Sequence, residues 1–297
     1  MEVMKEVIGK LQENIEKSNG SVEEMQCIFY ETAKELMNEC MLKIEDKENN
    51  KTLEIELKEL EFYYYDEEKH PDCYTHNDEE YQKNMKNILY IHKSNGKFTT
   101  NPRRGGIDIT FGNGKYYGGI LIRGVKINGK YIAGPANVRQ QIAKELGIIK
   151  NINEKFNHRD LQEKLNILYK HNQILFKKVS HDNSILVSVR VFDKNHSKNF
   201  SKFKNTLYRF LEETYLTSSP KNFLKNKNSL TNITLIKAIS YLSAISFKNI
   251  KITHEIEKKI NDIKTQKTKD FTDILNHINL LKQKLQENEC IKNKGTK

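Results

Sequence analysis

Tryptophan is absent from the 297-residue sequence, and proline and cysteine each occur only four times. The cysteines lie far apart and none belongs to a C-x-x-C pair: Cys27, Cys40, Cys73 and Cys290. Structural zinc sites and disulfide frameworks both draw on regularly spaced cysteines. The sequence therefore argues against both, and we expect no metal, no other cofactor and a reducing compartment.

Long hydrophobic runs are missing as well. A helix that crosses a membrane needs about 20 consecutive apolar residues, and no stretch of the sequence approaches that length. Residues 1–10 contain no apolar core of the length found in signal peptides. We expect a soluble cytoplasmic protein, associated with the nucleoid if it is bacterial, that has no membrane partner.

Acidic residues are the minority among the charges, because 50 Lys and Arg against 39 Asp and Glu give a net charge of +11. Such a balance favours an acidic partner, either nucleic acid or an anionic surface. Lysine and asparagine are abundant along the whole chain. The excess of positive charge therefore also fits an ordinary solvated surface.

The N-terminal region, residues 1–48, reads as an acidic helical hairpin packed on a main domain. Apolar residues recur at helical spacing as far as residue 45, with an interruption at residues 18–20. Ser21 and Glu24 then form a capping box, which marks the start of a second helix. The charged, asparagine-rich residues that follow predict a boundary.

The C-terminal region, residues 226–297, again has apolar residues at helical spacing, with lysines on the other faces. This pattern predicts two or three amphipathic helices. They are either a solvated bundle, or a surface that contacts nucleic acid or a second copy of the chain in a homo-oligomer.

Residues 49–225 read as an α+β domain built on a mixed antiparallel sheet. After an opening strand, we predict strands over 89–92, 105–111, 117–125 and 185–192, and helices over 137–146 and 160–169. Asn-Gly pairs at 113–114 and 128–129 predict hairpin turns. Gly147 follows the first of these helices and predicts its C-terminal end.

The opening strand, Leu53–Asp66, has a phase change. Leu53, Ile55 and Leu57 alternate with charged residues, but the same phase next presents Glu59 and Glu61. Either a β-bulge exchanges the two faces near position 58, or two carboxylates lie on the core side; a third interpretation is a strand that leaves the sheet and becomes solvated. Bulges are frequent beside active sites, and a carboxylate in a partly apolar site can act as a base near neutral pH.

Several short motifs, in order over residues 50–225, resemble the alkyladenine (methylpurine, 3-methyladenine) DNA glycosylase family. The first motifs are the Leu57–Tyr63 strand with two glutamates, a histidine-containing loop after it, and the hairpin 106–125 ending in Leu121-Ile122-Arg123. They are followed by segment 133–138 at a helix start and segment 146–148 at a helix end. The last motifs are Arg159-Asp160-Leu161 and the closing pairs Arg190-Val191 and Arg209-Phe210. Their order and spacing carry the resemblance. It implies an α+β fold of the methylpurine-DNA glycosylase type that accepts a flipped-out base and cleaves its N-glycosidic bond without a metal.

The resemblance also implies roles for individual residues. Glu61 would be the general base that activates water for attack on the sugar C1′, with Arg123 beside it holding the water or the carboxylate. Tyr63 would stack on the extruded base. His70 or His76, both in the loop after the strand, would close the other side of the pocket. The alternative interpretation of Glu61 is a surface or salt-bridged structural glutamate.

Two positions depart from the family pattern. The family inserts an aromatic wedge into the duplex shortly before the central strand, but residues 98–104 offer no aromatic at the aligned position. Arg103 and Arg104 would instead grip phosphates. Asp108 stands at the pocket wall where the family commonly has Asn, and an ionised carboxylate accepts but does not donate hydrogen bonds. The class of substrate therefore stays open: a modified base in duplex DNA, a single-stranded nucleic acid or a free nucleotide.

Three functions follow as hypotheses. The first is a DNA glycosylase-like hydrolase that excises a damaged or modified base. The second is a protein that keeps the fold and binds nucleic acid or a nucleotide without chemistry, which the missing wedge favours. The third is a structural adaptor that acts through its terminal helices.

Overall fold

The computed structural model describes residues 2–183, 185–188, 190, 203, 206, 208–212 and 215. Its helices are α1 Glu2–Lys17, α2 Val22–Asn38, the π-helical turn η1 Glu79–Lys83, α3 Pro135–Glu145 and α4 His158–Lys170. Its strands are β1 Cys40–Asp46, β2 Lys51–Tyr65, β3 Lys86–Ile91, β4 Ile107–Phe111, β5 Tyr117–Ile127, β6 Lys130–Ala133, β7 Ile174–Lys178, β8 Ile185–Ser188 and β9 Arg209–Glu212.

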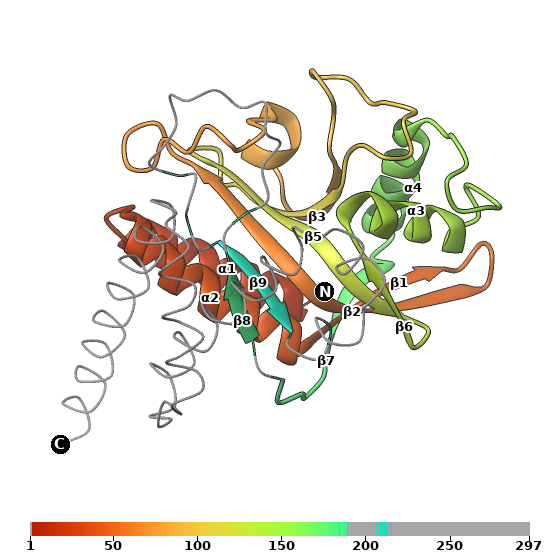
Figure 1. The fold of residues 1–297 in the computed structure, drawn as a ribbon, viewed down its shortest axis with the longest axis horizontal. Helices are drawn as coiled ribbons and strands as arrows, with labels where there is room; N and C mark the ends of the chain where they lie inside the picture. The colour runs from red at the N-terminus through yellow and green to blue at the C-terminus, as the bar shows by residue number, and fades with distance from the viewer. Residues whose placement is uncertain are drawn as a thin grey trace, which may run out of the picture.

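The described strands form one curled antiparallel sheet, so the fold class is α+β as predicted (Figure 1). The main path is β3-β4-β5-β2-β1-β7, with β6 paired to β5, β9 to β2, and β8 to β9. β2 is the longest strand. It pairs with β5 along one edge, and with β1 and then β9 along the other. This central strand carries both glutamates of the candidate site.

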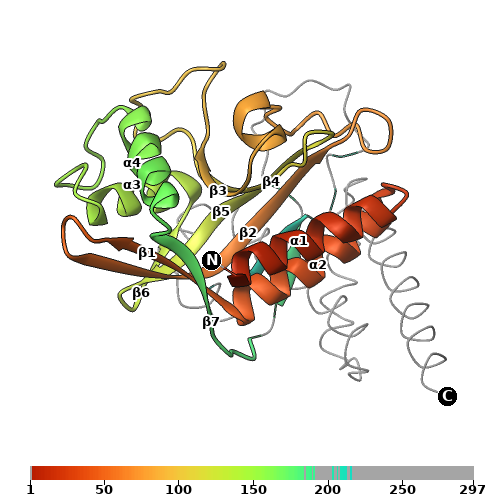
Figure 2. The ribbon, with the colours of Figure 1, turned by 180° about the vertical axis from the view of Figure 1, so that it is seen from behind.

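Helices α1 and α2 form the predicted hairpin and cover one face of the sheet (Figure 2). The Ser21 side chain accepts a hydrogen bond from the backbone N–H of Glu24, as expected for an N-cap. Phe29 of α2 stacks on Phe62 of β2 with ring centroids 4.7 Å apart. This contact lies within a large apolar core that the helical hairpin and the sheet share, so β2 has one face fixed against helices.

The phase change in β2 is a bulge, the first of the three predicted alternatives. In the pairing with β5, Leu57 is opposite Val125 and Glu59 is opposite Gly124, which leaves Lys58 as an extra residue. Immediately afterwards Leu60 is opposite Ile122, which leaves Arg123 as an extra residue on β5. The extra residue Lys58 exchanges the faces of β2 and the extra residue Arg123 exchanges those of β5, because an extra residue shifts the alternation of its own strand by one.

One segment differs from its prediction. Residues Cys40–Asp46, expected to continue the helical hairpin, form β1, and residues 47–50 are the turn that joins β1 to β2. In this strand Cys40, Leu42 and Ile44 are buried and the residues between them are partly exposed. A segment this short satisfies both periodicities, and antiparallel pairing with β2 and β7 selects the strand.

Most of the other elements agree with the sequence patterns where the structure describes them, but the turn η1 and the strands β7 and β9 had not been predicted. Asn128 and Gly129 both have positive φ, 50° and 75°, and join β5 to β6 as a two-residue hairpin turn. Helices α3 and α4 lie at the predicted positions, and Gly147, with φ of 76°, follows the end of α3. β8 covers the start of the strand predicted at 185–192. The predicted C-terminal helices of residues 226–297 lie outside the described residues.

Candidate active site

The bulge at Lys58 places both glutamates of β2 on the sheet face opposite the helical hairpin. Leu60, Phe62 and Tyr64 point to the helices and are buried in the shared core. Strand alternation therefore puts Glu59, Glu61 and Tyr63 on the other face. The two carboxylates are still buried, with 2% exposure for Glu59 and 0% for Glu61, so each needs a specific partner.

Arg123 is that partner for both carboxylates. Its Nε donates to Oε1 of Glu59 at 2.9 Å, and its Nη1 lies 3.3 Å from Oε2 of Glu61. Arg123 is the bulged residue of β5, so the irregular pairing aims its guanidinium at the neighbouring strand. Burial alone would lower the pKa of Arg123, but the charges of Glu61 and Glu59 outweigh it and raise the pKa.

Glu59 also binds a second cation. Arg209 of β9 donates from Nε at 2.8 Å and places Nη2 2.7 Å from the same Oε1, while the Tyr215 hydroxyl donates to Oε2 at 3.2 Å. Burial would raise the pKa of Glu59, but the guanidinium groups of Arg209 and Arg123 lower it. The four charged groups balance, because two arginines face two carboxylates.

Tyr63 completes the group around Glu61. Its hydroxyl donates to Oε1 of Glu61, and burial, followed by the charge of Glu61, raises the pKa of Tyr63 well above its usual range. One side of its ring is occupied by Arg190, whose guanidinium carbon lies 5.1 Å from the ring centroid. Arg190 is itself held by Asp72 in a fully buried ion pair with distances of 2.5 and 3.2 Å. The predicted trio of Glu61, Arg123 and Tyr63 is therefore brought together.

Asp108 lies on the same face, two strands away from Glu61. Leu121 of β5 is directly opposite both Glu61 on one side and Asp108 of β4 on the other. Asp108 is fully buried; its Oδ2 accepts from Nε2 of Gln82 at 2.9 Å, and its Oδ1 lies 2.6 Å from Nε2 of His92. Position 108, predicted to line the pocket, is thus a buried carboxylate that accepts a hydrogen bond from an amide and has an imidazole nitrogen beside its other oxygen.

Gly119 makes room for that arrangement. A Cβ atom at this position would lie 2.5 Å from Oδ2 of Asp108 and 2.9 Å from Nε2 of Gln82. We expect Gly119→Ala to lower the free energy of unfolding by about 1–3 kcal/mol, the usual effect of inserting a methyl group into a packed interior. Chemical denaturation followed by far-UV circular dichroism would measure the change.

Gly9→Ala is the matched control for that substitution. Gly9 lies on the exposed side of α1 and a Cβ there meets no atom within 4 Å. The alanine is expected to stabilise the protein by about 0.5–1 kcal/mol because glycine is the poorer helix former. If the two alanine variants changed the free energy of unfolding by the same amount, the space above Gly119 would not be filled by Asp108 and Gln82.

The two predicted loop histidines occupy different places. His76 is exposed and its ring lies 4.4 Å from the ring of His92, beside Asp108. His70 is buried; its Nδ1 lies 2.8 Å from the carbonyl oxygen of Gly20 and its ring is 5.2 Å from that of Tyr64. Since Tyr64 points to the helices, His70 lies on the opposite side of β2 from Glu61. The geometry therefore favours His76 as the pocket histidine.

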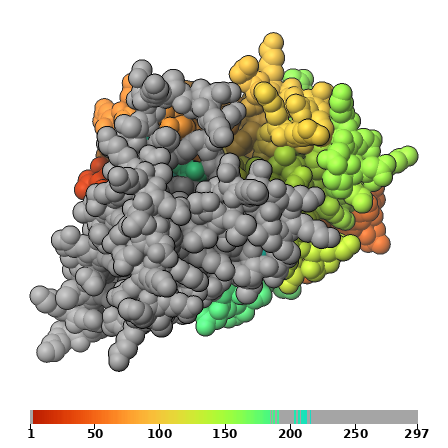
Figure 3. Space-filling view, in the orientation of Figure 1, coloured from red at the N-terminus to blue at the C-terminus, as the bar shows by residue number. Residues whose placement is uncertain are grey.

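Arg103 and Arg104 are exposed on the loop between β3 and β4. The guanidinium of Arg139 in α3 fixes this loop by donating to the carbonyl oxygens of Pro102, at 2.7 Å, Gly105, at 3.1 Å, and Arg104. In the space-filling view the yellow atoms of this loop lie next to the green atoms of the α3–α4 region (Figure 3). The two predicted phosphate-binding residues are therefore presented by a fixed loop. Burial lowers the pKa of Arg139 to about 10, so its guanidinium still carries the charge that these carbonyl oxygens accept from at neutral pH.

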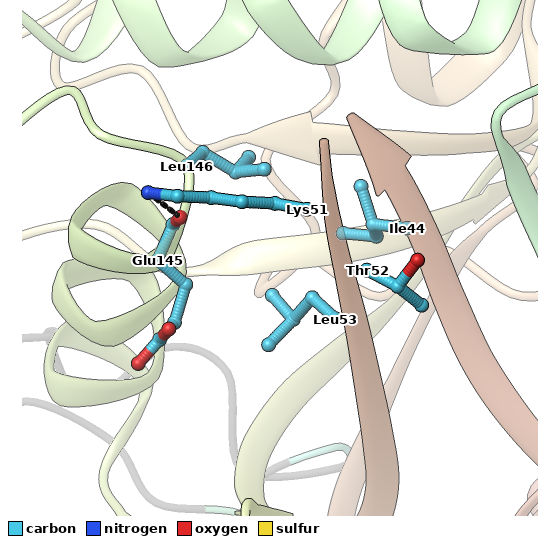
Figure 4. Close-up of a pocket in the computed structure, with 6 residues that line it drawn as sticks. All are labelled: Ile44, Lys51, Thr52, Leu53, Glu145 and Leu146. Carbon is cyan, nitrogen blue, oxygen red and sulfur yellow. Dashed lines mark hydrogen bonds between the residues drawn. The ribbon is translucent and has the colours of Figure 1, made fainter. Parts of the chain in front are cut away.

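A cavity of about 240 Å³ lies elsewhere, between the β1–β2 hairpin and the end of α3 (Figure 4). Its lining is Ile44, Lys51, Thr52, Leu53, Glu145 and Leu146. Lys51 Nζ donates to the carbonyl oxygen of Glu145 at 3.2 Å. Because Lys51 and Glu61 are ten residues apart on β2, about 30 Å along a strand, this cavity is separate from the carboxylates.

Metal-binding groups and membrane-spanning helices were both searched for among the described residues. There, no group of three or more His, Cys, Asp or Glu side chains is placed to hold a metal ion. No helix among the same residues has the length and apolar character needed to cross a membrane.

The sequence patterns missed several members of the site. Glu59 was visible as the partner of Glu61 in the phase change, but nothing local indicated that it would bind Arg209. His92 and Gln82 carried no signal apart from the position of His92 at a strand end. These contacts depend on the order of the strands, which a local pattern does not specify.

No model of a protein family matches the sequence, and no curated protein matches it. The resemblance to alkyladenine DNA glycosylases therefore rests on the quoted motifs alone.

Proposed function

We propose that the protein is a DNA glycosylase-like hydrolase that removes a modified or damaged base by cleaving its N-glycosidic bond. The observation that carries the proposal is the arrangement of Glu61, whose carboxylate has Arg123 on one oxygen and the Tyr63 hydroxyl on the other. Hydrolysis of an N-glycoside needs a carboxylate to take a proton from water and to stabilise a cationic sugar. This trio supplies such a carboxylate in a defined orientation.

In the proposed reaction the water oxygen bonds to C1′ of a flipped-out nucleotide and gives its proton to Glu61. The bond between C1′ and the base nitrogen breaks, and its electron pair leaves with the base. Arg123 orients the carboxylate, and Glu59 in turn orients Arg123 through a hydrogen bond of 2.9 Å. Because Arg190 covers one side of the Tyr63 ring, an extruded base would stack on the other side, which is worth roughly 1–3 kcal/mol.

DNA is the proposed partner. The net charge of +11 and the exposed guanidinium groups of Arg103 and Arg104 support it, since phosphate contacts supply most of the affinity of such proteins for nucleic acid. The reaction needs no metal or organic cofactor. A cytoplasmic location and assembly through the terminal helices belong to the same proposal.

Binding of nucleic acid or a nucleotide without catalysis is the second candidate function. Two observations favour it. Glu61 is fully buried. The half-buried ring of Phe98, the aromatic residue of the β3–β4 loop, packs on Lys93, whose Nζ lies 5.5 Å from the ring centroid. A protein of this kind would use the charge-balanced group around Glu59 and Glu61 to stabilise the sheet.

Base release distinguishes the two candidates. Wild-type protein and Glu61→Gln would be incubated with alkylated DNA, with deaminated DNA, with modified phage-type DNA and with free nucleotides, and the freed base detected by mass spectrometry. Release by the wild type that Glu61→Gln abolishes would support the hydrolase and name its substrate class. Salt-dependent DNA binding without release from any substrate would support the binding protein.

A further inference from the structure

Arg209 of β9 is a buried cation to which the proposed hydrolysis gives no role. Its residue is 7% exposed, and it lies in the strand that pairs with β2 next to the bulge. In that pairing Arg209 is directly opposite Glu61, and Leu211 is directly opposite Glu59. Because directly opposite residues share one face of a sheet, Arg209 lies on the face that carries both carboxylates.

The guanidinium of Arg209 binds its diagonal neighbour on β2. Its Nε donates to Oε1 of Glu59 at 2.8 Å, and its Nη2 lies 2.7 Å from the same oxygen. Diagonal neighbours on a sheet are within reach of long side chains. The positive charge of Arg209 is therefore directed to Glu59, although Glu61 is the residue across from it.

Glu59 is the carboxylate that two arginines share. Arg123 Nε donates to Oε1 at 2.9 Å, so three guanidinium nitrogens surround this one oxygen. The Tyr215 hydroxyl donates to the other oxygen, Oε2, at 3.2 Å. A carboxylate oxygen has about two sites for hydrogen-bond donors. Arg209 therefore takes up much of the charge and bonding capacity that Glu59 would otherwise direct to Arg123.

Arg123 divides its charge between the two carboxylates. Besides the hydrogen bond to Glu59, its Nη1 lies 3.3 Å from Oε2 of Glu61. The closer contact is the one with Glu59, and the attraction between opposite charges grows as their distance falls. Without Arg209, Glu59 would draw the guanidinium of Arg123 away from Glu61. With Arg209 present, one arginine is available for each carboxylate.

A second buried ion pair holds β9 in this register. Lys58, the extra residue of the β2 bulge, pairs with Glu212 of β9, and both residues are 3% exposed. A shift of β9 by one residue would set Glu212 opposite Glu59, and like charges directly opposite each other are destabilising. The charge pattern of the two strands therefore selects the pairing that brings Arg209 to Glu59.

We propose that Arg209 is a positioning residue of the hydrolase: by neutralising Glu59, it leaves Arg123 available to orient Glu61. The inference rests on the proposed function. In this scheme Arg209 contacts neither the water nor the substrate, and it acts only through Glu59 and Arg123. Strand β9 then belongs to the active site, because it supplies the charge that sets the orientation of the general base.

The test is single-turnover base release from alkylated, deaminated and phage-type modified DNA, at protein concentrations that saturate DNA binding. Arg209→Gln should slow release by about 10²-fold, the usual effect of misplacing a reacting group by about 1 Å. Adding Glu59→Gln removes the charge that draws Arg123 away, so the double variant should release base faster than Arg209→Gln. Arg209→Lys keeps the positive charge and should also be faster than Arg209→Gln.

Lys58→Gln is the matched control, because it breaks the other buried ion pair between β2 and β9 and leaves the contacts of Glu59 unchanged. While folded, it should release base at the wild-type rate. If Arg209→Gln does not fold, the double variant is compared with Glu59→Gln. In Glu59→Gln the unpaired Arg209, which is opposite Glu61, would compete with Arg123, so the double variant should again be faster.

Failure of this inference and failure of the proposed hydrolase give different results. Release by Arg209→Gln at the same rate as by Lys58→Gln would remove the positioning role and leave the hydrolase standing. A double variant no faster than the single variants would do the same. Release of no base by the wild type would remove the hydrolase and with it the role of Arg209.

Discussion

Glu61→Gln is expected to slow base release by about 10²–10⁴-fold, the range for loss of a general base. The glutamine amide keeps an oxygen that accepts from the Tyr63 hydroxyl, but it cannot take the proton of the attacking water. Arg123 retains Glu59 as a partner, so we expect the variant to fold. Single-turnover release measured by mass spectrometry, beside far-UV circular dichroism at the assay temperature, would separate lost chemistry from lost structure.

Glu54→Gln is the matched control for that experiment. Glu54 is on the same strand, but its side chain is 49% exposed and its contact with Lys177 is at 4.0 Å. A surface ion pair of this kind contributes about 0–1 kcal/mol, and no role in the site is proposed for it. A folded Glu61→Gln variant that releases base as fast as Glu54→Gln would rule out Glu61 as the general base.

Glu59→Gln is expected to lower the free energy of unfolding by about 3–5 kcal/mol, the usual cost of breaking a buried ion pair by removing one partner. Arg209 would lose the carboxylate that faces its Nε and Nη2 atoms, and Arg123 would keep only Glu61. Chemical denaturation followed by far-UV circular dichroism would measure the loss, since the chain has no tryptophan to report unfolding.

The pH dependence of that effect has a definite sign. The pKa of Glu59 is lowered in the folded protein, so its stabilising effect is fully present above the ordinary glutamate pKa of about 4.3. The effect is lost as the pH falls through the lower, folded pKa. The difference in stability between wild type and Glu59→Gln should therefore shrink in acid.

A double-mutant cycle would assign the Glu59 effect to its contact with Arg209. In the Glu59→Gln background, Arg209→Gln should cost much less stability than it does in the wild type, because the unpaired charge is removed. If Arg209→Gln lowered the stability equally in the wild type and in Glu59→Gln, the two residues would not interact. The distances of 2.7 and 2.8 Å from Arg209 Nη2 and Nε to Glu59 Oε1 indicate that they do.

Much of the local structure could be predicted from short patterns. The capped start of α2, the Asn-Gly turn between β5 and β6 and the glycine that follows α3 each depend on a few neighbouring residues. In each case one backbone conformation or one side-chain hydrogen bond decides the outcome. The phase change in β2 belongs with them, although the sequence left three interpretations open.

Segments with two compatible periodicities could not be predicted in this way. Cys40–Asp46 fits a helix or a strand, and only its pairing with β2 and β7 selects the strand. The same reason explains the members of the site that the sequence analysis missed. His92, Gln82 and Arg209 come from three separate segments, and only the strand order brings them to Asp108 and Glu59.

The sequence by itself determined the charge of the chain, most of its helices, strands and turns, and the candidate trio of Glu61, Arg123 and Tyr63 through a resemblance of motifs. Tertiary structure alone decided which way the β2 bulge turns its glutamates, which histidine lies beside Asp108, and how two buried carboxylates are matched by two arginines. The physical reason is that burial and charge pairing join residues distant in the chain, whereas sequence periodicity reports only on neighbours.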